Sequence, residues 1–309
     1  MIYTITLNPA VDRELTVPEI IYDAVLRATE ARVDFGGKGF NVSRILMGLG
    51  VRSTAMGFMG GRAGELLRDG LEGLGILTDF VWVAGETRTN VSIVTQNNEK
   101  YIKVNEQGPL VDKEKQQELL DRIDAVAQPG DWWVLAGSLP PGVDAGYYAE
   151  LTRVINQHAG KVILDTSGKA LGSGLVEKPF LVKPNAEEAH QVTGLPVETI
   201  EDIKAVAQEL RARGTENIVI SMGKKGALLQ TTEGTWMTHS PKIKEMNPIG
   251  AGDSMVGGLV YGLSLGKSLK EALGWGVASG AATASLPGTQ VGSLALIQSL
   301  LDQVVFEKL

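Results

Sequence analysis

The chain has 309 residues, of which 43% are hydrophobic and 21% charged, as in an ordinary globular protein, so we exclude a disordered or fibrous chain. A net charge of −7 argues against general nucleic-acid binding, which calls for a basic surface. The absence of cysteine excludes disulfides, thiolate zinc sites and cysteine nucleophiles, and it is compatible with a reducing compartment.

The segment MIYTITLNPAVD lacks the basic start and the cleavage-site pattern of a secretory signal. No apolar stretch approaches the roughly 18 residues of a membrane span. We therefore expect a cytoplasmic protein with neither a membrane nor a nucleic-acid partner. Because α/β folds of this length often form around one sheet, we expect a single domain over residues 1–309 with a small appendage.

Strands and helices alternate along the predicted chain. Runs rich in β-branched and apolar residues predict strands at Tyr3–Leu7, Ser53–Phe58, Trp132–Ala136, Lys161–Leu164, Phe180–Val182 and Asn217–Ser221. Helical periodicity predicts helices from Gly39 to Gly50, and at Asp112–Val126, Ala145–Gln157 and Glu201–Ala212. The alternation implies βαβ crossovers, so we predict an α/β fold with a mainly parallel central sheet covered by helices on both faces.

Two segments, residues 12–35 and 87–105, interrupt this alternation. In the second, Asn90–Thr95 and Lys100–Val104 resemble the strands of a hairpin that turns at Gln96–Glu99. We predict that the two segments form a small β lid over one end of the sheet. Since the exposed strands of a lid leave unpaired edges that a second subunit can cover, we also expect a homodimer formed through this lid.

The carboxyl-terminal part is dense in small residues, and we predict two closely packed helices at Gly250–Gly266 and Gly274–Gly288. The stretch GLSLGKS at residues 262–268 resembles a phosphate-binding P-loop, but it is one residue short and follows a helix. We therefore interpret it as the end of a helix.

The segment NPIGAGD at residues 247–253 carries the strongest chemical signal. Its glycines allow consecutive backbone N–H groups to point to one spot, where a helix N-terminus adds roughly half a positive charge, and this spot suits a phosphate. The carboxylate of Asp253 would repel a phosphate and fits a general base that accepts a hydroxyl proton. Taken alone, a glycine turn in which Asp253 caps the helix explains the segment equally well.

The segment GGKGFN at residues 36–41 is suited to a sugar. Its glycines let the backbone approach a ligand closely, the amide of Asn41 can both donate and accept hydrogen bonds, and Lys38 adds a positive charge. On pattern alone, Asn41 also fits an ordinary polar residue at a helix start.

These two segments, in this order, resemble the two signatures of the ribokinase or PfkB family of sugar kinases, and the resemblance covers essentially the whole chain. It implies a ribokinase-like fold and transfer of the γ-phosphate of ATP to a sugar hydroxyl. It also implies that Asp253 is the catalytic base and that Gly250, Ala251 and Gly252 form an anion hole, with Gly252 also at the nucleotide. For the sugar site it implies Gly37, Lys38 and Asn41, together with Asp12 in LNPAVD and Ser138 in AGSLPPG.

The opening TLNPAVD further resembles the branch of the family that acts on phosphorylated ketohexoses. A phosphosugar needs a second cationic pocket, and guanidinium groups pair well with phosphate oxygens. We select Arg88, which matches the Thr-Arg element of the branch, and add Lys38, Arg27 and Lys103 as candidates. Arg27 and Lys103 fit solvated charges of the lid equally well.

The segment KPNAEE at residues 183–188 resembles family elements that place Lys183 near the ATP phosphates. The same resemblance implies that Asn185 and Glu188 organise Mg²⁺ through water, with Asp165 as a weaker candidate for this network. Asn185 and Glu188 also form a capping-box pattern, and both interpretations can hold together.

The segment SMGKKGA at residues 221–227 resembles the strand and loop before the adenine pocket of the family, although by itself it fits a plain hairpin turn. The resemblance implies that Ser221, Gly223 and Gly226 lie at the nucleotide.

We therefore predict a kinase that uses ATP and Mg²⁺ to phosphorylate a ketohexose phosphate. We favour fructose 1-phosphate, because the opening and the GGKGFNVSR run are most similar to those of its kinases. Tagatose 6-phosphate and fructose 6-phosphate remain open as alternatives. A non-catalytic sensor of sugar phosphates would also keep this fold, but it has no need of Asp253 as a base beside intact glycines.

Overall fold

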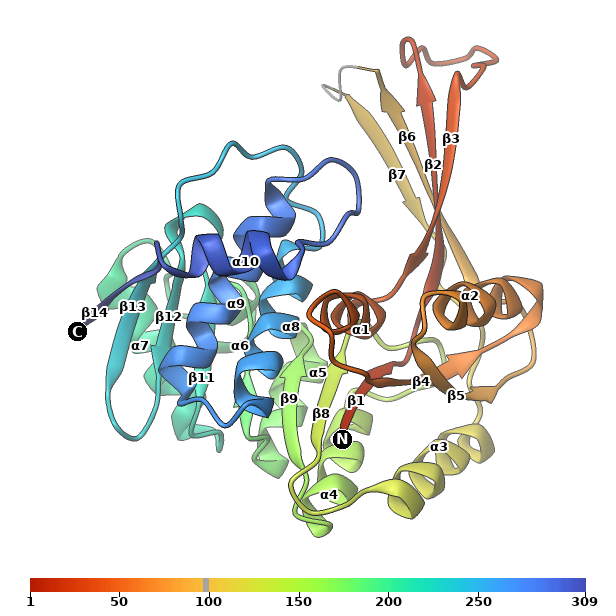
Figure 1. The fold of residues 1–309 in the computed structure, drawn as a ribbon. Coiled ribbons are helices and arrows are strands. Elements are labelled where there is room, and N and C mark those ends of the chain that lie inside the picture. Colours follow the sequence, from red (N-terminus) through yellow and green to blue (C-terminus); the bar gives the residue numbers. More distant parts are fainter. Residues whose placement is uncertain (97–99) are drawn as a thin grey trace.

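The computed structural model describes residues 1–96 and 100–309, whose strands form a large and a small sheet (Figure 1). The parallel strands of the large sheet are, in spatial order, β11 (Ile218–Ser221), β10 (Leu181–Val182), β9 (Lys161–Asp165), β8 (Trp132–Ala136), β1 (Ile2–Thr6), β4 (Thr54–Met59) and β5 (Leu77–Trp82). Antiparallel strands extend it beyond β11, namely β12 (Ala227–Gln230), β13 (Thr235–His239) and β14 (Val305–Lys308).

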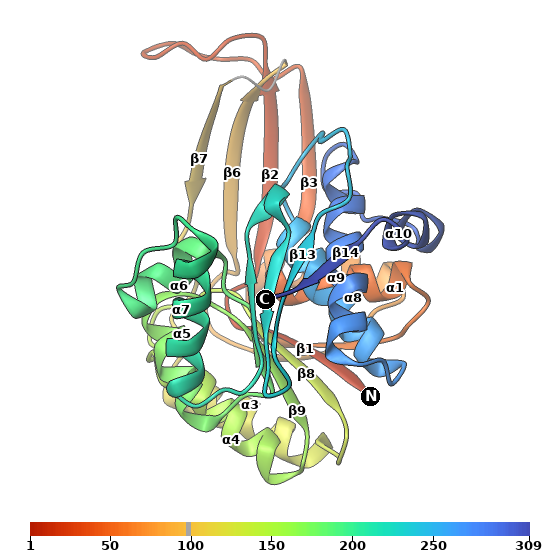
Figure 2. The same ribbon diagram turned by 90° about the vertical axis from the view of Figure 1, so that its left-hand side faces the viewer.

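Helices cover both faces of the large sheet (Figure 2). One face carries α3 (Lys113–Val126), α4 (Tyr147–Gln157), α5 (Gly168–Gly174), α6 (Ala186–Thr193) and α7 (Ile200–Ala212). The other carries α1 (Lys38–Gly48), α2 (Gly61–Gly73), α8 (Ala251–Ser264) and α9 (Leu269–Ala284), against which α10 (Leu294–Leu301) packs. The predicted α/β fold, with a mainly parallel sheet and helices on both faces, is confirmed.

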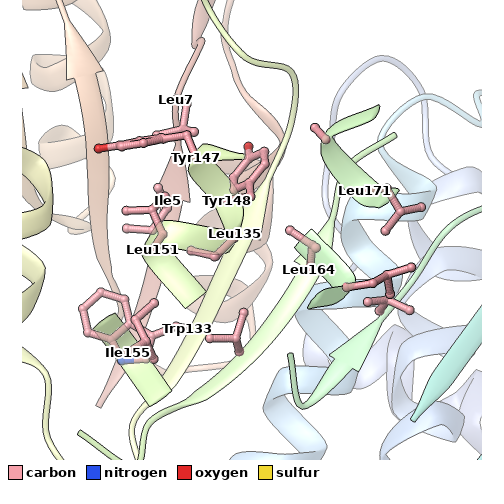
Figure 3. Close-up of a cluster of buried hydrophobic side chains, with 14 of the residues drawn as sticks. Ile5, Leu7, Trp133, Leu135, Tyr147, Tyr148, Leu151, Ile155, Leu164 and Leu171 are labelled. Carbon is pink, nitrogen blue, oxygen red and sulfur yellow. The ribbon is translucent and has the colours of Figure 1, made fainter. Parts of the chain in front are cut away.

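The core between α4 and the sheet holds the central strands in place (Figure 3). Tyr147, Tyr148, Leu151 and Ile155 of α4 pack onto large side chains of β1, β8 and β9, among which Trp133 is fully buried. Burying each such side chain contributes about 1.5–3 kcal/mol. The same core fixes the carboxyl ends of these strands, which is where a parallel sheet binds its ligands.

The small sheet projects from the body of the molecule (Figures 1 and 2). Its strands are, in spatial order, β3 (Glu30–Gly36), β2 (Ala10–Val17), β6 (Arg88–Thr95) and β7 (Tyr101–Asn105). β2 is antiparallel to β3 and parallel to β6, and β6 is antiparallel to β7. Within the predicted hairpin turn at Gln96–Glu99, residues 97–99 lie outside the described residues.

The prediction for the second carboxyl-terminal helix was wrong in its boundaries. α9 begins after Ser268 rather than at Gly274, because Ser268 and Glu271 form a reciprocal capping box that stabilises a helix start. It ends at Ala284, before the predicted end at Gly288. Among the described residues, none of the helices has both the length and the apolar character needed to cross a membrane.

Candidate active site

A cleft of about 1060 Å³ opens at the carboxyl ends of β9, β10 and β11 and is bounded by the start of α8. This edge of a parallel sheet is where α/β folds bind ligands. Many residues selected from the sequence line it, namely Lys38, Asp165, Lys183, Asn185, Glu188, Ser221, Gly223, Gly226, Ala251, Gly252 and Asp253. Gly250 lies next to them as the residue before α8.

The start of α8 is shaped by a tight glycine turn. Gly250 has φ of 80°, a backbone angle that residues with a side chain rarely adopt. The Ala251 N–H donates to the Pro248 carbonyl at 3.2 Å, so it takes part in the turn. The N–H groups of Gly252 and Asp253 belong to the first helical turn, where they have no intrahelical acceptor. The predicted anion hole therefore rests mainly on these two amides.

The carboxylate of Asp253 is buried in the first turn of α8. It accepts a hydrogen bond of 2.7 Å from Nδ2 of Asn41 in α1. Burial and the nearby charge of Asp165 raise the pKa of Asp253, whereas the Asn41 bond, Lys38 and Lys183 lower it, and the net result is a pKa of about 6. A carboxylate with a pKa near the working pH is suited to general-base catalysis.

A buried carboxylate holds two lysines beside the cleft. Asp165 is 1% exposed, and its Oδ1 lies 3.2 Å from Nζ of Lys38 and 3.5 Å from Nζ of Lys183. Burial lowers the pKa of Lys38, but the carboxylates of Asp165, Glu188 and Asp253 outweigh this effect, and the pKa is raised. Lys38 is therefore held in its charged form. The ammonium of Lys183 lies beside Gly252, because a Cβ built there would be 3.9 Å from its Nζ.

The two residues proposed for magnesium form a capping box at the start of α6. The Asn185 N–H donates to Oε2 of Glu188 at 2.8 Å, and the Glu188 N–H donates to Oδ1 of Asn185 at 2.8 Å. Oε1 of Glu188 lies 3.8 Å from Nζ of Lys38 and lines the cleft. The two lysines, Lys38 and Lys183, lie among the carboxylates of Asp165, Glu188 and Asp253, which offset their positive charge. A bound triphosphate would therefore need further positive charge, and a hydrated Mg²⁺ beside Glu188 could supply it.

The sugar-site candidates gather where the small sheet meets α1. Asp12 accepts a hydrogen bond of 2.8 Å from Nδ2 of Asn90, and burial raises its pKa. A Cβ at Gly36 would lie 2.2 Å from Oδ2 of Asp12 and 2.9 Å from the carbonyl oxygen of Ala10, so a side chain there would displace Asp12. A cavity of about 60 Å³ is lined by Asp12, Asn41 and Gly250 and lies between β3, α1 and α8. Gly37, with φ of 144°, precedes α1.

Arg88 and Lys103 lie near Asp12 in the small sheet, because Arg88 pairs with Ala10 and Lys103 pairs with Ser92 of β6. Both charges lower the pKa of Asp12. The guanidinium of Arg88 donates to the carbonyls of Asn8 at 2.9 Å, Glu106 at 3.3 Å and Pro9 at 3.4 Å. Lys103 is exposed on β7. Arg88 therefore connects the segment between β1 and β2 to the residues after β7.

The two remaining candidates are Ser138 and Arg27. Ser138 is exposed and follows β8 by two residues. Arg27 is exposed in the segment that joins β2 to β3, at the end of the small sheet far from the large one (Figure 1). The fold thus separates Arg27 from Asp12.

Sequence reasoning missed two contributions to the site. The Asn90 side chain is buried, and Nδ2 holds Asp12 while Oδ1 has no hydrogen-bond partner within the described residues. Gly280, Ala281 and Ala284 of α9 line the cleft, whereas the sequence pattern of small residues indicates only closely packed helices. Their spacing along one helical face is the signal that could have revealed them.

The model of the pfkB family carbohydrate kinases matches residues 3–295 of the chain. The chain is 37% identical to the 1-phosphofructokinase of Bacillus subtilis over 309 residues, which cover 100% of both chains. It is 35% identical to the 1-phosphofructokinase of Borreliella burgdorferi over 285 residues, 92% of each chain. A crystal structure of phosphofructokinase-2 from Escherichia coli with potassium superimposes with a TM-score of 0.93 at 30% identity, covering 98% of each chain. This chain belongs to the pfkB family of carbohydrate kinases.

Proposed function

We propose that this protein transfers the γ-phosphate of ATP to the free primary hydroxyl of fructose 1-phosphate, which gives fructose 1,6-bisphosphate and ADP. The observation that carries the proposal is the buried carboxylate of Asp253 at the helix start, between the cleft and Asn41. The full-length relatives named 1-phosphofructokinase support the choice of sugar.

ATP would occupy the large cleft, with its triphosphate directed toward the start of α8. Lys183 faces that helix start beside Gly252, and Ser221, Gly223 and Gly226 also line the cleft. A triphosphate there would meet the free amides of the first helical turn and the helix dipole.

The sugar would lie where the small sheet meets α1 and α8. Asp12 and Asn41 present acceptors and donors for hydroxyl groups, and the backbone at Gly37 allows close approach. Lys38 and Ser138 would complete this group. The sugar's own phosphate would pair with Arg88 and Lys103, the cations beside Asp12. Arg27 is not included in this site, because it lies at the end of the small sheet far from the large one.

In the reaction, the hydroxyl oxygen attacks the γ-phosphorus in line while Asp253 accepts the hydroxyl proton. The bond from the γ-phosphorus to the bridging oxygen breaks, and ADP leaves. The amides of Gly252 and Asp253 and the ammonium of Lys183 stabilise the negative charge on the transferred group. When bound beside Glu188 and Asn185 through water, Mg²⁺ would supply charge neutralisation of the phosphates.

The small sheet would act as a lid that excludes water from the transferred phosphate. Tyr101 and Val104 of β7, and Val33 of β3, expose apolar side chains on this sheet. An exposed apolar strand edge is a natural pairing surface for a second copy of the chain. We therefore also propose a homodimer formed through the small sheet.

The test measures ADP formation with Mg²⁺ and ATP for fructose 1-phosphate, tagatose 6-phosphate and fructose 6-phosphate in parallel. A higher kcat/KM for fructose 1-phosphate supports the proposal. A preference for either 6-phosphate reassigns the sugar while keeping the chemistry. Binding of sugar phosphates without ADP formation would instead identify a sensor and remove Asp253 from the role of base.

A further inference from the structure

The segment 285–291 that follows α9 connects the small sheet to the turn before α8. The hydroxyl of Thr289 donates to Oδ1 of Asp34 in β3 at 2.7 Å. Nδ2 of Asn247, in the turn that leads to Gly250, donates to the carbonyl of Gly288 at 2.8 Å. Two consecutive residues, Gly288 and Thr289, therefore contact two parts of the site that are far apart in sequence.

On the side of the small sheet, the carboxylate of Asp34 is fixed by charge and by strand pairing. Its Oδ2 pairs with Nε of Arg32 at 2.9 Å, and Arg32 also pairs with Glu14 on β2 at 3.2 Å. Asp34 is the cross-strand partner of Asp12, the candidate ligand of the sugar. A shift of Asp12 along with its strand therefore carries Asp34 with it.

On the side of α8, the turn at residues 247–253 is held by hydrogen bonds to the end of α9. The amides of Met246 and Asn247 donate to the carbonyl of Ala284 at 2.8 and 3.2 Å. Oδ1 of Asn247 accepts from the Ile249 N–H at 3.0 Å, just before Gly250. The side chain of Asn247 thus links the carbonyl of Gly288 to the turn that presents the phosphate-binding amides.

A third contact ties the segment to α1. Nη2 of Arg44 donates to the carbonyl of Thr289 at 3.1 Å, and Arg44 lies one helical turn after Asn41, which bonds the base. Burial lowers the pKa of Arg44. Thr289 therefore receives contacts from β3 through its hydroxyl and from α1 through its carbonyl.

We propose that Thr289 is a positioning residue that couples occupation of the sugar site to the geometry of the phosphate-binding turn at residues 247–253. A sugar held by Asp12 on β2 would fix the position of the paired strand β3, and Asp34 on β3 would fix the position of Thr289. Gly288, the neighbour of Thr289, would then fix the side chain of Asn247 and so the amides of the turn that follows. This inference rests on the proposed function, because it assumes that a sugar phosphate binds at Asp12.

The experiment compares Thr289→Val with Thr289→Ser. Valine keeps the shape of threonine but loses the donor to Asp34, whereas serine keeps the hydroxyl. Two rates are measured for each variant with Mg²⁺ and ATP: sugar-dependent ADP formation with the sugar phosphate that the wild type prefers, and the slow ADP formation without sugar. Thermal unfolding of each variant reports on its folding.

For Thr289→Val we expect kcat with the sugar to fall about tenfold, the size expected for one hydrogen bond to a carboxylate. Sugar-independent hydrolysis should stay within about twofold of wild type, and Thr289→Ser should restore kcat. Equal losses in the rates with and without sugar would mean general damage to the turn. An unchanged kcat would mean that the hydrogen bond from Thr289 to Asp34 does not contribute to catalysis. Either result overturns the inference.

A double-mutant cycle gives a second, independent measurement. If Thr289 and Asn247 act through one chain of contacts, the effects of Thr289→Val and Asn247→Ala on kcat should not add. Additive effects would overturn the inference.

Should Thr289→Val fold poorly, Asp34→Asn replaces it in both experiments, since it weakens the same hydrogen bond from the other side. A wild type that forms no ADP with any sugar phosphate would refute the proposed function itself.

Discussion

Asn41 and Asp253 are joined by a hydrogen bond of 2.7 Å that crosses from α1 to α8. The bond connects a residue selected for sugar binding to the candidate base, and it favours the charged form of the carboxylate. A sugar held by Asn41 would therefore lie next to the group that accepts its proton.

Replacing the base should abolish turnover without abolishing binding. We expect Asp253→Asn to lower kcat by at least about 100-fold, because general-base catalysis contributes on this order. Titration calorimetry should still show binding of ATP and the phosphosugar. Asp69→Asn, at an exposed position on α2, is the matched control and should keep wild-type kcat. Turnover retained in Asp253→Asn would remove this residue from the role of base.

The pH profile should report the raised pKa of Asp253. The base must be deprotonated, so kcat/KM of the wild type should rise as the pH passes through about 6. In Asn41→Ala the carboxylate loses a bond that stabilises its charge, so its pKa increases and the acid limb moves to higher pH.

Wild type and Asn41→Ala are measured with the same sugar phosphate, so titration of the substrate affects both pH profiles equally. Any difference between their acid limbs therefore comes from a group of the enzyme. Asn156→Ala, which removes an amide bound to the carbonyl of Glu177 on the opposite face of the sheet, should leave the limb in place. Identical limbs in wild type and Asn41→Ala would contradict the assignment.

The magnesium requirement should depend on the charge of Glu188. Glutamine can replace glutamate in a capping box, so Glu188→Gln should leave the stability of α6 nearly unchanged. Loss of the carboxylate should raise the Mg²⁺ concentration for half-maximal activity about tenfold. Glu271→Gln makes the same exchange in the capping box of α9 and serves as the control. A similar Mg²⁺ dependence in both variants would place the metal elsewhere.

Arg88 should act on the phosphosugar rather than on ATP. We expect Arg88→Ala to raise KM for the phosphosugar at least about tenfold and to leave KM for ATP unchanged, since the guanidinium lies beside Asp12. Its bonds to the carbonyls of Asn8, Pro9 and Glu106 add a structural role. Arg88→Lys keeps the charge and should show a smaller increase. Equal increases in both KM values would indicate that only the structural role exists.

The proposed homodimer can be tested on the small sheet. Val104 is exposed on β7, and placing lysine there would put a charge into the expected interface. We expect Val104→Lys to shift the sedimentation coefficient from that of a dimer to that of a monomer. Val176→Lys changes a valine of similar exposure outside the small sheet and should leave the sedimentation coefficient unchanged. A wild type that sediments as a monomer would refute the proposal directly.

Local patterns determined much of the fold. Trp132–Ala136 forms β8 with the predicted boundaries, and Asp112 caps α3 where the helix was expected to begin. Such signals depend on residues within a few positions of each other, so they can be interpreted without tertiary contacts. The prediction failed where two local signals competed, as at Ser268, where a capping box was overlooked in favour of a glycine six residues later.

The sequence by itself also determined the candidates for the chemical step, because Asp253 and its glycines form one short segment. Only the tertiary structure decided their environment. The pKa of Asp253 depends on burial, on Asp165 and on Asn41, and the place of Lys183 depends on Asp165. These partners come from different strands and helices. Desolvation and charge pairing act through space, so they are set by the packing of distant segments and not by spacing along the chain.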